Sequence, residues 1–278
     1  MLSYRHAFHA GNHADVLKHI VLVQVLEHMR QKDKAFWVID THAGAGLYAL
    51  DEGYATKLAE HVDGVSRLWS RTDLPPAVAE YLDAVRSING DRLSAYPGSP
   101  WIAQHYLREQ DRLRLFELHS SDARLLADNL RHAAHQTIVT QGDGFAGLKA
   151  ILPPPPRRAV TLIDPSYELP EDYTRVVTAL RDSLQRFATG TYAVWYPMLS
   201  KPESRRFAQK LKEIEVDNWL HVSLSVRAPE AMGMFGSGMF VINPPWKLME
   251  TLRGVMPWLT EVLAQDEGAS FVLEGESK

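Results

Sequence analysis

The chain has 278 residues, of which 45% are hydrophobic, a formal net charge of -4 and no cysteine. The length fits one large domain or two small ones, and the negative charge excludes a globally basic surface, so any nucleic-acid surface must be a local patch. The lack of cysteine excludes disulfides and thiolate metal sites and fits a reducing cytoplasm. The sequence contains no signal-peptide core and no run of about 18 apolar residues, so we predict a cytoplasmic protein without a membrane span.

The N-terminal part of the chain predicts a helix, a strand and a turn of small residues. Residues 1–13 are rich in His, Gly and Asn and are predicted to be irregular, while apolar residues at helical spacing predict a helix over residues 14–30. Residues 36–39 form a short apolar strand that ends in Asp40, and residues 41–46 follow as a turn. Glycines in such a turn let a ligand approach the backbone closely.

An insertion separates the first strand from the second. The second strand, residues 113–116, ends in Glu117, which lies 77 residues after Asp40. A plain nucleotide-binding fold places an acid roughly 20 residues on. Residues 54–89 predict two helices with a proline break between them. We therefore predict a helical subdomain over residues 47–95, inserted into a main domain formed by residues 1–46 and 96–278.

The remaining sequence alternates strands with helices. Ser99 is predicted to be the N-cap of the helix that follows the insertion, because Pro100 suits the first helical position. The last two strands have no helix between them and should be antiparallel. Strands are predicted at residues 137–140, 159–163, 192–196, 219–226 and 239–242, and helices at 121–132, 172–187 and 203–213.

Four strands in succession end in an acidic residue or in a turn that carries one: Asp40, Glu117, Asp143 and Asp164. The carboxyl ends of parallel strands meet at one edge of a sheet, where open α/β folds bind ligands. A carboxylate after the second strand is suited to accept two ribose hydroxyls, and an Asp after the third can accept a hydrogen bond from an adenine amino group. The ordered set therefore predicts a nucleoside site.

The segment Asp164-Pro165-Ser166-Tyr167 follows the buried strand at residues 159–163. Proline cannot extend a central strand, so the chain must turn there. Taken alone, this segment is also ordinary turn chemistry. Its place directly after the third-strand turn that carries Asp143 favours a functional role.

These motifs resemble those of the class I S-adenosylmethionine-dependent methyltransferases. Asp40 to Gly46 is similar to their cofactor loop, and Asp164 to Tyr167 to their catalytic motif for amino groups of bases. The N-terminal stretch from Met1 to His19 and the segment Tyr96-Pro97-Gly98-Ser99-Pro100 are more distinctive. With them, nearly the whole chain closely resembles the RlmJ family, bacterial methyltransferases of adenine N6 in large-subunit (23S) ribosomal RNA.

The resemblance implies a Rossmann-like, seven-stranded class I methyltransferase sheet, with six parallel strands and the last antiparallel. It implies S-adenosylmethionine as cofactor, S-adenosylhomocysteine as product, no metal, and large-subunit ribosomal RNA as partner of a monomer. Cofactor contacts are implied for His19, His42, Gly44, Ser99, Glu117, Asp143, Gly144 and Asp164. Catalytic roles are implied for Asp164, Pro165 and Tyr167, and substrate contacts for Tyr4, Lys18 and Tyr167.

The chain departs from the family pattern at Ser166, where a second proline is usual. Asp164 and the carbonyl of Pro165 can still each accept one hydrogen of the adenine amine, which aims its lone pair at the methyl group. Tyr167 can stack on the base, which is worth roughly 1–3 kcal/mol. Ser166 thus makes the loop less rigid without removing any of these groups.

Other interpretations remain open. His6, His9 and His13 could bind a metal by residue type, but no carboxylate or thiolate completes a recognisable spacing. A DNA adenine methyltransferase shares the amino-group motif, yet residues 47–95 hold five Lys/Arg against eight Asp/Glu and make a poor DNA surface. A non-catalytic RNA-binding protein and a nicotinamide oxidoreductase are the remaining alternatives. Because a paired base must be flipped out and no basic cradle is evident, we expect free ribosomal RNA as substrate.

A second segment, Asn243-Pro244-Pro245-Trp246, also fits the amino-methyltransferase pattern. The strand before it is expected to be antiparallel, so its carboxyl end should point away from the cofactor edge of the sheet. We therefore predict that Asn243 caps a turn and that Trp246 packs against the fold.

Overall fold

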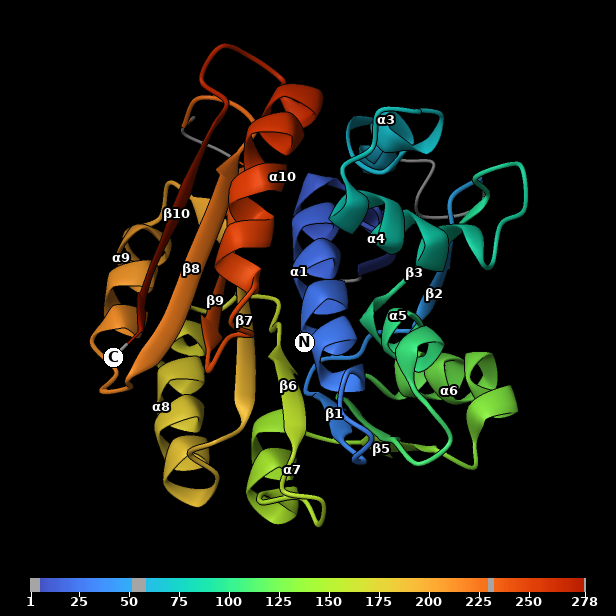
Figure 1. The fold of residues 1–278 in the computed structure, drawn as a ribbon, viewed down its shortest axis with the longest axis vertical. Helices are drawn as coiled ribbons and strands as arrows, with labels where there is room; N and C mark the ends of the chain where they lie inside the picture. The colour runs from blue at the N-terminus through green and yellow to red at the C-terminus, as the bar shows by residue number, and fades with distance from the viewer. Residues whose placement is uncertain (1–5, 52–58, 230–232, 278) are drawn as a thin grey trace.

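A mixed sheet of eight strands forms the centre of the computed structural model, which describes residues 6–51, 59–229 and 233–277 (Figure 1). The strands are β1 Trp37–Asp40, β4 Arg112–Glu117, β5 Thr137–Gln141, β6 Ala159–Ile163, β7 Thr191–Leu199, β8 Asn218–Ser225, β9 Met234–Ile242 and β10 Ser270–Ser277. They lie in the order β10-β8-β9-β7-β6-β1-β4-β5. Because β9 pairs antiparallel with both β7 and β8, and β10 antiparallel with β8, the other six strands all run in one direction.

The α/β class, the six parallel strands and the antiparallel β9 agree with the prediction, but the predicted total of seven strands is wrong. The additional strand, β10, pairs with β8 along the edge of the sheet. Its side chains are exposed or half-buried along its whole length, so it lacks the apolar alternation that marks a half-buried strand.

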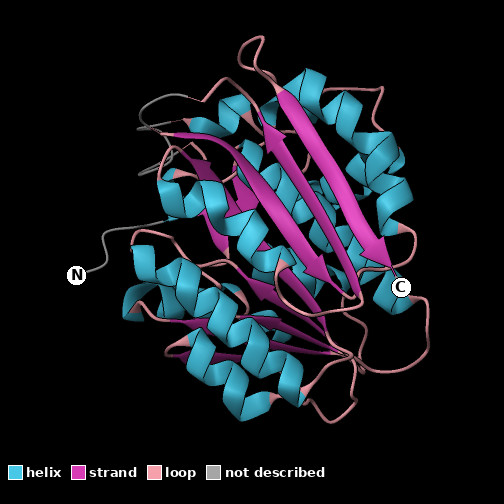
Figure 2. Ribbon diagram, turned by 90° about the vertical axis from the view of Figure 1, so that its left-hand side faces the viewer, coloured by secondary structure: helices cyan, strands magenta, loops and turns pink. Residues whose placement is uncertain are grey.

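Helices cover both faces of the sheet (Figure 2). One face carries α1 His13–Arg30, α5 Ser99–Tyr106, α6 Ser120–Asn129 and α10 Leu248–Leu263, and the other carries α7 Gly144–Ile151, α8 Pro170–Arg186 and α9 Pro202–Lys212. The prediction did not include α7 and α10, and the N-cap of α5 is Gly98 instead of Ser99. None of the helices in these ranges is long and apolar enough to cross a bilayer.

Helix α1 is the element that carries polar side chains into the molecule. Asn12 caps it by accepting hydrogen bonds from the backbone N–H groups of Ala14 and Asp15. Most of its residues are buried, including Asp15, Lys18 and His19, because it lies among the sheet, α5 and the region before α5. Charged groups on such a helix must find partners within the fold.

The region predicted as an insertion contains β2 Leu47–Ala49, the 3₁₀ helix η2 Glu60–Asp63, α3 Ser66–Trp69 and α4 Pro76–Arg86, and it leads into β3 Ala95–Pro97. Strands β2 and β3 form a separate antiparallel pair. Val78, Leu82 and Val85 of α4 belong to the same hydrophobic core as α1. The part of the predicted helices at residues 52–58 lies outside the described residues, and the subdomain boundary stays a prediction.

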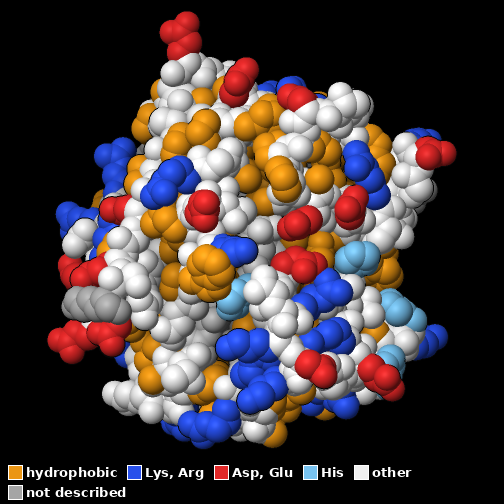
Figure 3. All heavy atoms as spheres, viewed as in Figure 1, with side chains coloured by type: hydrophobic (Ala, Val, Ile, Leu, Met, Phe, Trp, Pro, Cys, Tyr) orange, Lys and Arg blue, Asp and Glu red, His pale blue; other side chains and the backbone are white. Residues whose placement is uncertain are grey.

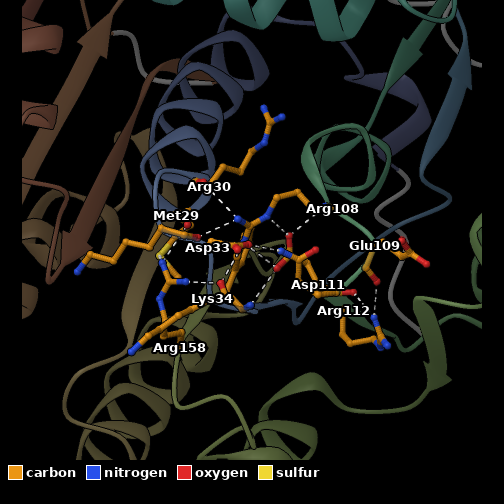
Figure 4. Close-up of polar contacts among 12 residues, drawn as sticks. Met29, Arg30, Asp33, Lys34, Arg108, Glu109, Asp111, Arg112 and Arg158 are labelled. Atoms are coloured by element: carbon orange, nitrogen blue, oxygen red, sulfur yellow. Dashed lines mark hydrogen bonds and ion pairs between the residues drawn. The ribbon is translucent and has the colours of Figure 1, made fainter.

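An arginine network closes the edge of the sheet where the parallel strands begin (Figure 4). Arg108 forms an ion pair with the buried Asp111, with 2.9 Å between Nε and Oδ2. Arg158 donates to the carbonyl of Met29 at 2.9 Å. Arg108 also donates to the carbonyl oxygens of Arg30, Lys32 and Lys34. Together these bonds tie the end of α1 to the starts of β4 and β6. Figure 3, drawn from the same side as Figure 1, shows Lys and Arg side chains gathered on the lower half of the molecular surface.

Candidate active site

Two adjoining cavities, of about 220 and 470 Å³, open at the carboxyl ends of the parallel strands. His6, Lys18, Asp164 and Ser166 line both of them. The first cavity brings together most of the side chains that the sequence predicted for a cofactor site: His42, Gly44, Ser99, Glu117, Asp143, Gly144 and Asp164. Segments from four strand ends thus meet in one place, as expected for an open α/β sheet.

Glu117 ends β4 at the floor of the first cavity and is 8% exposed. Its Oε2 accepts a hydrogen bond of 2.8 Å from the backbone N–H of Gly44, and Oε1 accepts one of 2.7 Å from that of His119. Gly44 has φ +60°, in the left-handed region that favours glycine. Burial raises the pKa of Glu117 above its ordinary value. The carboxylate therefore fixes the glycine turn and can also accept ligand hydroxyls.

The turn after β5 forms another wall. Asp143 caps α7 by accepting from the backbone N–H of Phe145 at 2.9 Å, and it pairs with Arg175 at 2.7 Å. A side chain at Gly144 would collide with the carbonyl oxygen of Thr41, so the two turns can approach only because this residue is glycine. Both Asp143 and Gly144 line the cavity.

Asp40 lies behind the first cavity and holds its back wall. Its Oδ2 accepts a 2.6 Å hydrogen bond from the hydroxyl of Ser99, and its Oδ1 accepts from the backbone N–H of His42 at 3.1 Å. Burial raises the pKa of Asp40 to about 6. Burial also lowers the pKa of His42 to about 4, so this imidazole is neutral at pH 7.

Asp164 stands where the two cavities meet. Its Oδ2 accepts from Lys18 Nζ at 2.7 Å, and Lys18 also pairs with Asp15 Oδ1 at 2.8 Å. The side chain of Asp164 is 13% exposed, whereas that of Lys18 is 5% exposed. No hydrogen bond to Oδ1 of Asp164 comes from any residue within the described ranges. Burial raises the pKa of Asp164, and the ion pair with Lys18 opposes that shift.

The rest of the predicted catalytic segment divides between the cavities and the core. Pro165 lines the first cavity, and Ser166 lines both. Tyr167 does not line either cavity. Its ring is 2% exposed and packs against Tyr173, with 4.7 Å between ring centroids, and its hydroxyl donates to the carbonyl of Trp195 at 2.6 Å.

Stacking on a base would require the Tyr167 ring to leave this core, so the structure does not bring Tyr167 to its predicted position. The residue instead anchors the turn, in which its φ is +53°. Among the Phe, Tyr and Trp residues that the structure describes, Trp195 is the one that lines the second cavity. Nothing in the sequence around Trp195 distinguished it from a core residue.

His19, another predicted residue, is not among the residues that line the two cavities. His19 is fully buried, with its Nδ1 2.7 Å from the hydroxyl of Tyr96 and its Nε2 without a hydrogen-bond partner. Burial and the charge of Lys18 hold the pKa of His19 well below its ordinary value. Tyr4 lies outside the described residues, so its predicted contact with the substrate stays a prediction.

Sequence reasoning also missed residues of the site. Asp15 fixes the ammonium of Lys18, and the i,i+3 spacing of the two residues on α1 was the signal that could have identified it. Arg175 lines the first cavity from α8, and its guanidinium lies 4.8 Å from the ring centroid of Phe145. No sequence pattern pointed to Arg175 as a residue of the site, because Asp143, with which it pairs there, comes from a different strand end.

The N-terminal histidines have partners of another kind. His6 Nε2 lies 2.9 Å from Asp15 Oδ2, and His9 Nδ1 lies 3.0 Å from Glu60 Oε1. Within the residues that the structure describes, no group of three or more His, Cys, Asp and Glu side chains could hold a metal ion.

The second candidate motif lies at the opposite edge of the sheet, because β9 is antiparallel to β7. Asn243 Nδ2 donates to the carbonyls of Ala188 and Gly190 at 2.8 and 2.7 Å, which is a turn-capping role. The predicted packing of Trp246 is wrong, since this side chain is 72% exposed. Neither residue lines either of the two cavities.

Comparisons with known proteins agree with this architecture. Residues 33–273 match the model of the family described as Ribosomal RNA large subunit methyltransferase D, RlmJ. A Haemophilus influenzae protein named Ribosomal RNA large subunit methyltransferase J is 44% identical over 277 residues, which cover 99% of this chain and 98% of that protein. An Escherichia coli protein of the same name is 46% identical over 261 residues, 93% of each chain.

A crystal structure shows the same fold over almost the whole chain. Protein LPL1258 from Legionella pneumophila superposes with a TM-score of 0.90 at 37% sequence identity, covering 97% of this chain and 99% of that one. The predicted resemblance is therefore confirmed, and the chain belongs to the RlmJ family of ribosomal RNA large-subunit methyltransferases.

Proposed function

We propose that this protein transfers a methyl group from S-adenosylmethionine to the N6 amine of an adenine in large-subunit (23S) ribosomal RNA. The observation that carries the proposal is the position of Asp164. This carboxylate stands between two cavities, with its Oδ2 held by Lys18 and its Oδ1 without a hydrogen bond from the described residues. A methyl donor in one cavity and a base in the other could thus meet at the carboxylate of Asp164.

The first cavity fits the cofactor by the chemistry of its walls. Glu117 presents carboxylate oxygens for ribose hydroxyls, and Asp143 with the backbone at Gly144 can meet the adenine ring. Gly44 gives close access to the backbone, and Ser99 and His42 are oriented by Asp40. We include His19 because its buried Nε2 lacks a partner. When bound, S-adenosylmethionine supplies an electrophilic methyl group on a positively charged sulfur.

The protein's own part in the reaction is to position the amine and accept its proton. Oδ1 of Asp164 and the carbonyl of Pro165 can each accept one amine hydrogen, which directs the nitrogen lone pair towards the first cavity. Lys18 keeps Oδ2 occupied and so fixes the orientation of the carboxylate. Because burial raises the pKa of Asp164, its Oδ1 is a better proton acceptor than an exposed aspartate. Alignment of this kind supplies much of the acceleration.

The second cavity is the proposed entrance for the base. Trp195 and Lys18 lie on its wall, and Glu60 and Asp63 of the inserted region form another part of it. We therefore propose that residues 47–95 act as an inserted subdomain that shapes this entrance. Tyr4 and Tyr167 remain proposed substrate residues, and for Tyr167 this requires its loop to turn.

We further propose that the protein acts as a cytoplasmic monomer on free ribosomal RNA before subunit assembly. Both cavities are lined by one chain. A base in a duplex must be flipped out at a cost of a few kcal/mol, and assembly would add the cost of displacing ribosomal contacts.

The test is methyl transfer from labelled S-adenosylmethionine to protein-free 23S ribosomal RNA and to assembled large subunits, with mass mapping of the product. We expect N6-methyladenosine at one position, formed on free RNA at least about tenfold faster, which corresponds to 1.4 kcal/mol. Methylation of another base or of DNA alone would contradict the proposed substrate. Equal rates on both RNA substrates would contradict action before assembly.

Glu117→Ala should weaken S-adenosylmethionine binding by about 2–3 kcal/mol, as expected when hydrogen bonds to a charged group are removed. Calorimetric titration measures this directly. Glu117→Gln is the matched control, because it keeps the shape and one acceptor oxygen and should lose less affinity. Thermal melts of both variants check that the turn at Gly44, which Glu117 also holds, remains folded. An Ala variant within twofold of wild-type affinity would remove Glu117 from the cofactor site.

A further inference from the structure

A group of exposed cations lies along α9, a helix whose start is close to the second cavity. Lys201 immediately precedes the helix, and Arg205, Arg206 and Lys210 lie on its outer face. These four residues are called the α9 cation group below. The inner face of the helix is buried and consists of Ser204, Phe207 and Leu211. Figure 1 shows α9 on the side of the sheet away from α1, and the helix packs against β7 and α8.

The spacing concentrates the charge. Lys201 and Arg205, and likewise Arg206 and Lys210, are four residues apart and therefore neighbours on the helix surface. Residues 200–212 hold five Lys/Arg against one Asp/Glu, a net charge of +4, in a chain whose net charge is -4. Like charges at this spacing repel, and Lys201 at the N-terminus of α9 also opposes the helix dipole. The arrangement is unfavourable for α9 alone and favours an anionic partner.

The described part of the protein does not supply that partner. Within the described ranges, none of the four side chains has an ion pair or a side-chain hydrogen bond. The arginine network at the opposite edge of the sheet differs in this respect, because Arg108 and Arg158 donate to backbone carbonyls at the end of α1 and in the loop after it. Lys212, at the far end of α9, is bonded to Glu274. The donors of the α9 cation group are thus available to a ligand.

Hydrogen bonds fix the start of α9 to the wall of the second cavity. Ser204 Oγ donates to the carbonyl of Pro197 at 2.8 Å and accepts from the backbone N–H of Leu199 at 2.9 Å. Pro197 and Leu199 line the second cavity together with Asp164. The acidic residues that follow α9, at positions 213, 215 and 217, come after its other end. Lys201, which precedes α9, is therefore nearest to the proposed entrance for the base, and the other three cations lead away from it along the helix.

We propose that the α9 cation group binds the phosphates of the RNA strand next to the methylated base. This rests on the proposed function and adds the surface that would hold the substrate. A helix of 11 residues is about 16 Å long, so the group extends past several successive phosphates. Contacts of this kind position a strand without reading its sequence. They would offset part of the cost of drawing the base into the second cavity.

The test removes the four charges together, in the variant Lys201→Gln/Arg205→Gln/Arg206→Gln/Lys210→Gln. We expect KM for free 23S ribosomal RNA to rise at least about tenfold, with kcat at saturating RNA within about twofold of wild type. The plot of log affinity against log salt concentration should become less steep by about 3, because each of the four phosphates that is no longer neutralised contributes about 0.7 for a single strand. Affinity for S-adenosylmethionine should stay at the wild-type value. A general loss of structure would lower it, so this measurement separates the two causes.

The matched control removes four charges elsewhere, in Arg124→Gln/Arg157→Gln/Arg181→Gln/Arg253→Gln, all exposed arginines. The control should retain the wild-type KM and most of the salt dependence. Wild-type KM and salt slope in the α9 variant, or equal effects in the control, would overturn the proposal. If the wild-type protein fails to methylate RNA, the proposed function is wrong. The salt dependence of its affinity for unmodified RNA, compared between wild type and the α9 variant, still tests whether the α9 cation group binds phosphates.

Discussion

Asp164→Ala should reduce methyl transfer by about a thousandfold or more while the protein stays folded. The variant loses the oxygen that accepts the amine hydrogen and, later, the proton, and positioned acid–base groups contribute about 10²–10⁴-fold. It also leaves Lys18 with one carboxylate partner instead of two. Initial rates with free 23S ribosomal RNA, divided by the folded fraction from circular dichroism, give the effect. Asp164→Asn keeps the shape and should be nearly as inactive.

The look-alike segment provides the internal control. Asn243→Ala removes the two hydrogen bonds to the carbonyls of Ala188 and Gly190 and places alanine at a φ of +52°. It should therefore destabilise the fold by about 1–2 kcal/mol yet keep most activity per folded molecule. An inactive but well-folded Asn243→Ala beside an active Asp164→Ala would reverse the assignment of the two motifs.

The cofactor side of the site could be predicted from the sequence because its signals are local. Each strand end is a short apolar run followed by an acid or a glycine turn, and the parallel topology brings the ends together. Glu117 and Asp143 thus lie in one cavity, although 25 residues separate them in the chain. Strand direction alone predicted at which edge of the sheet each of the two candidate catalytic motifs lies. It therefore also predicted that Asn243 lies away from the cavities.

The substrate side could not be predicted in the same way, because it depends on which side of a turn each ring faces. The hydroxyl of Tyr167 bonds to the backbone of β7 and its ring enters the core of α8 and α9, while Trp195 of β7 faces the second cavity. The sequence does not indicate whether an aromatic ring near the end of a strand enters the core or faces a cavity. The final strand, β10, escaped prediction for a related reason, since its side chains bury little and its pairing is fixed by the neighbour, β8.

The environment of Lys18 in the folded protein could not be inferred from its spacing on α1. From spacing alone it was equally compatible with the solvated face of α1 and with a site. The structure gives it 4% exposure and two carboxylate partners, Asp15 and Asp164, the second of them 146 residues away. The pKa of Lys18 is raised well above its ordinary value, since the two carboxylates outweigh desolvation. The ammonium is therefore charged at neutral pH.

Lys18→Met should lower the free energy of unfolding by about 3–5 kcal/mol at pH 7, because it leaves two buried carboxylates without their cation. Urea unfolding followed by circular dichroism measures the loss. Arg71→Met is the control, since the Arg71–Asp73 pair is exposed and such pairs contribute about 1 kcal/mol or less.

The pH dependence separates this cause from a simple loss of packing. In wild type the pKa of Asp15 is held well below its ordinary value by His6 and Lys18, in spite of its burial. Without Lys18, burial raises the folded-state pKa of Asp164 further above its unfolded value, while Asp15 keeps only His6 to oppose its burial, so protonation favours the folded variant. The difference from wild type should then narrow as the pH falls from 7 to 5. A loss that stays constant over this range would mean that Lys18 acts through its hydrocarbon chain, and not by neutralising the carboxylates of the active site.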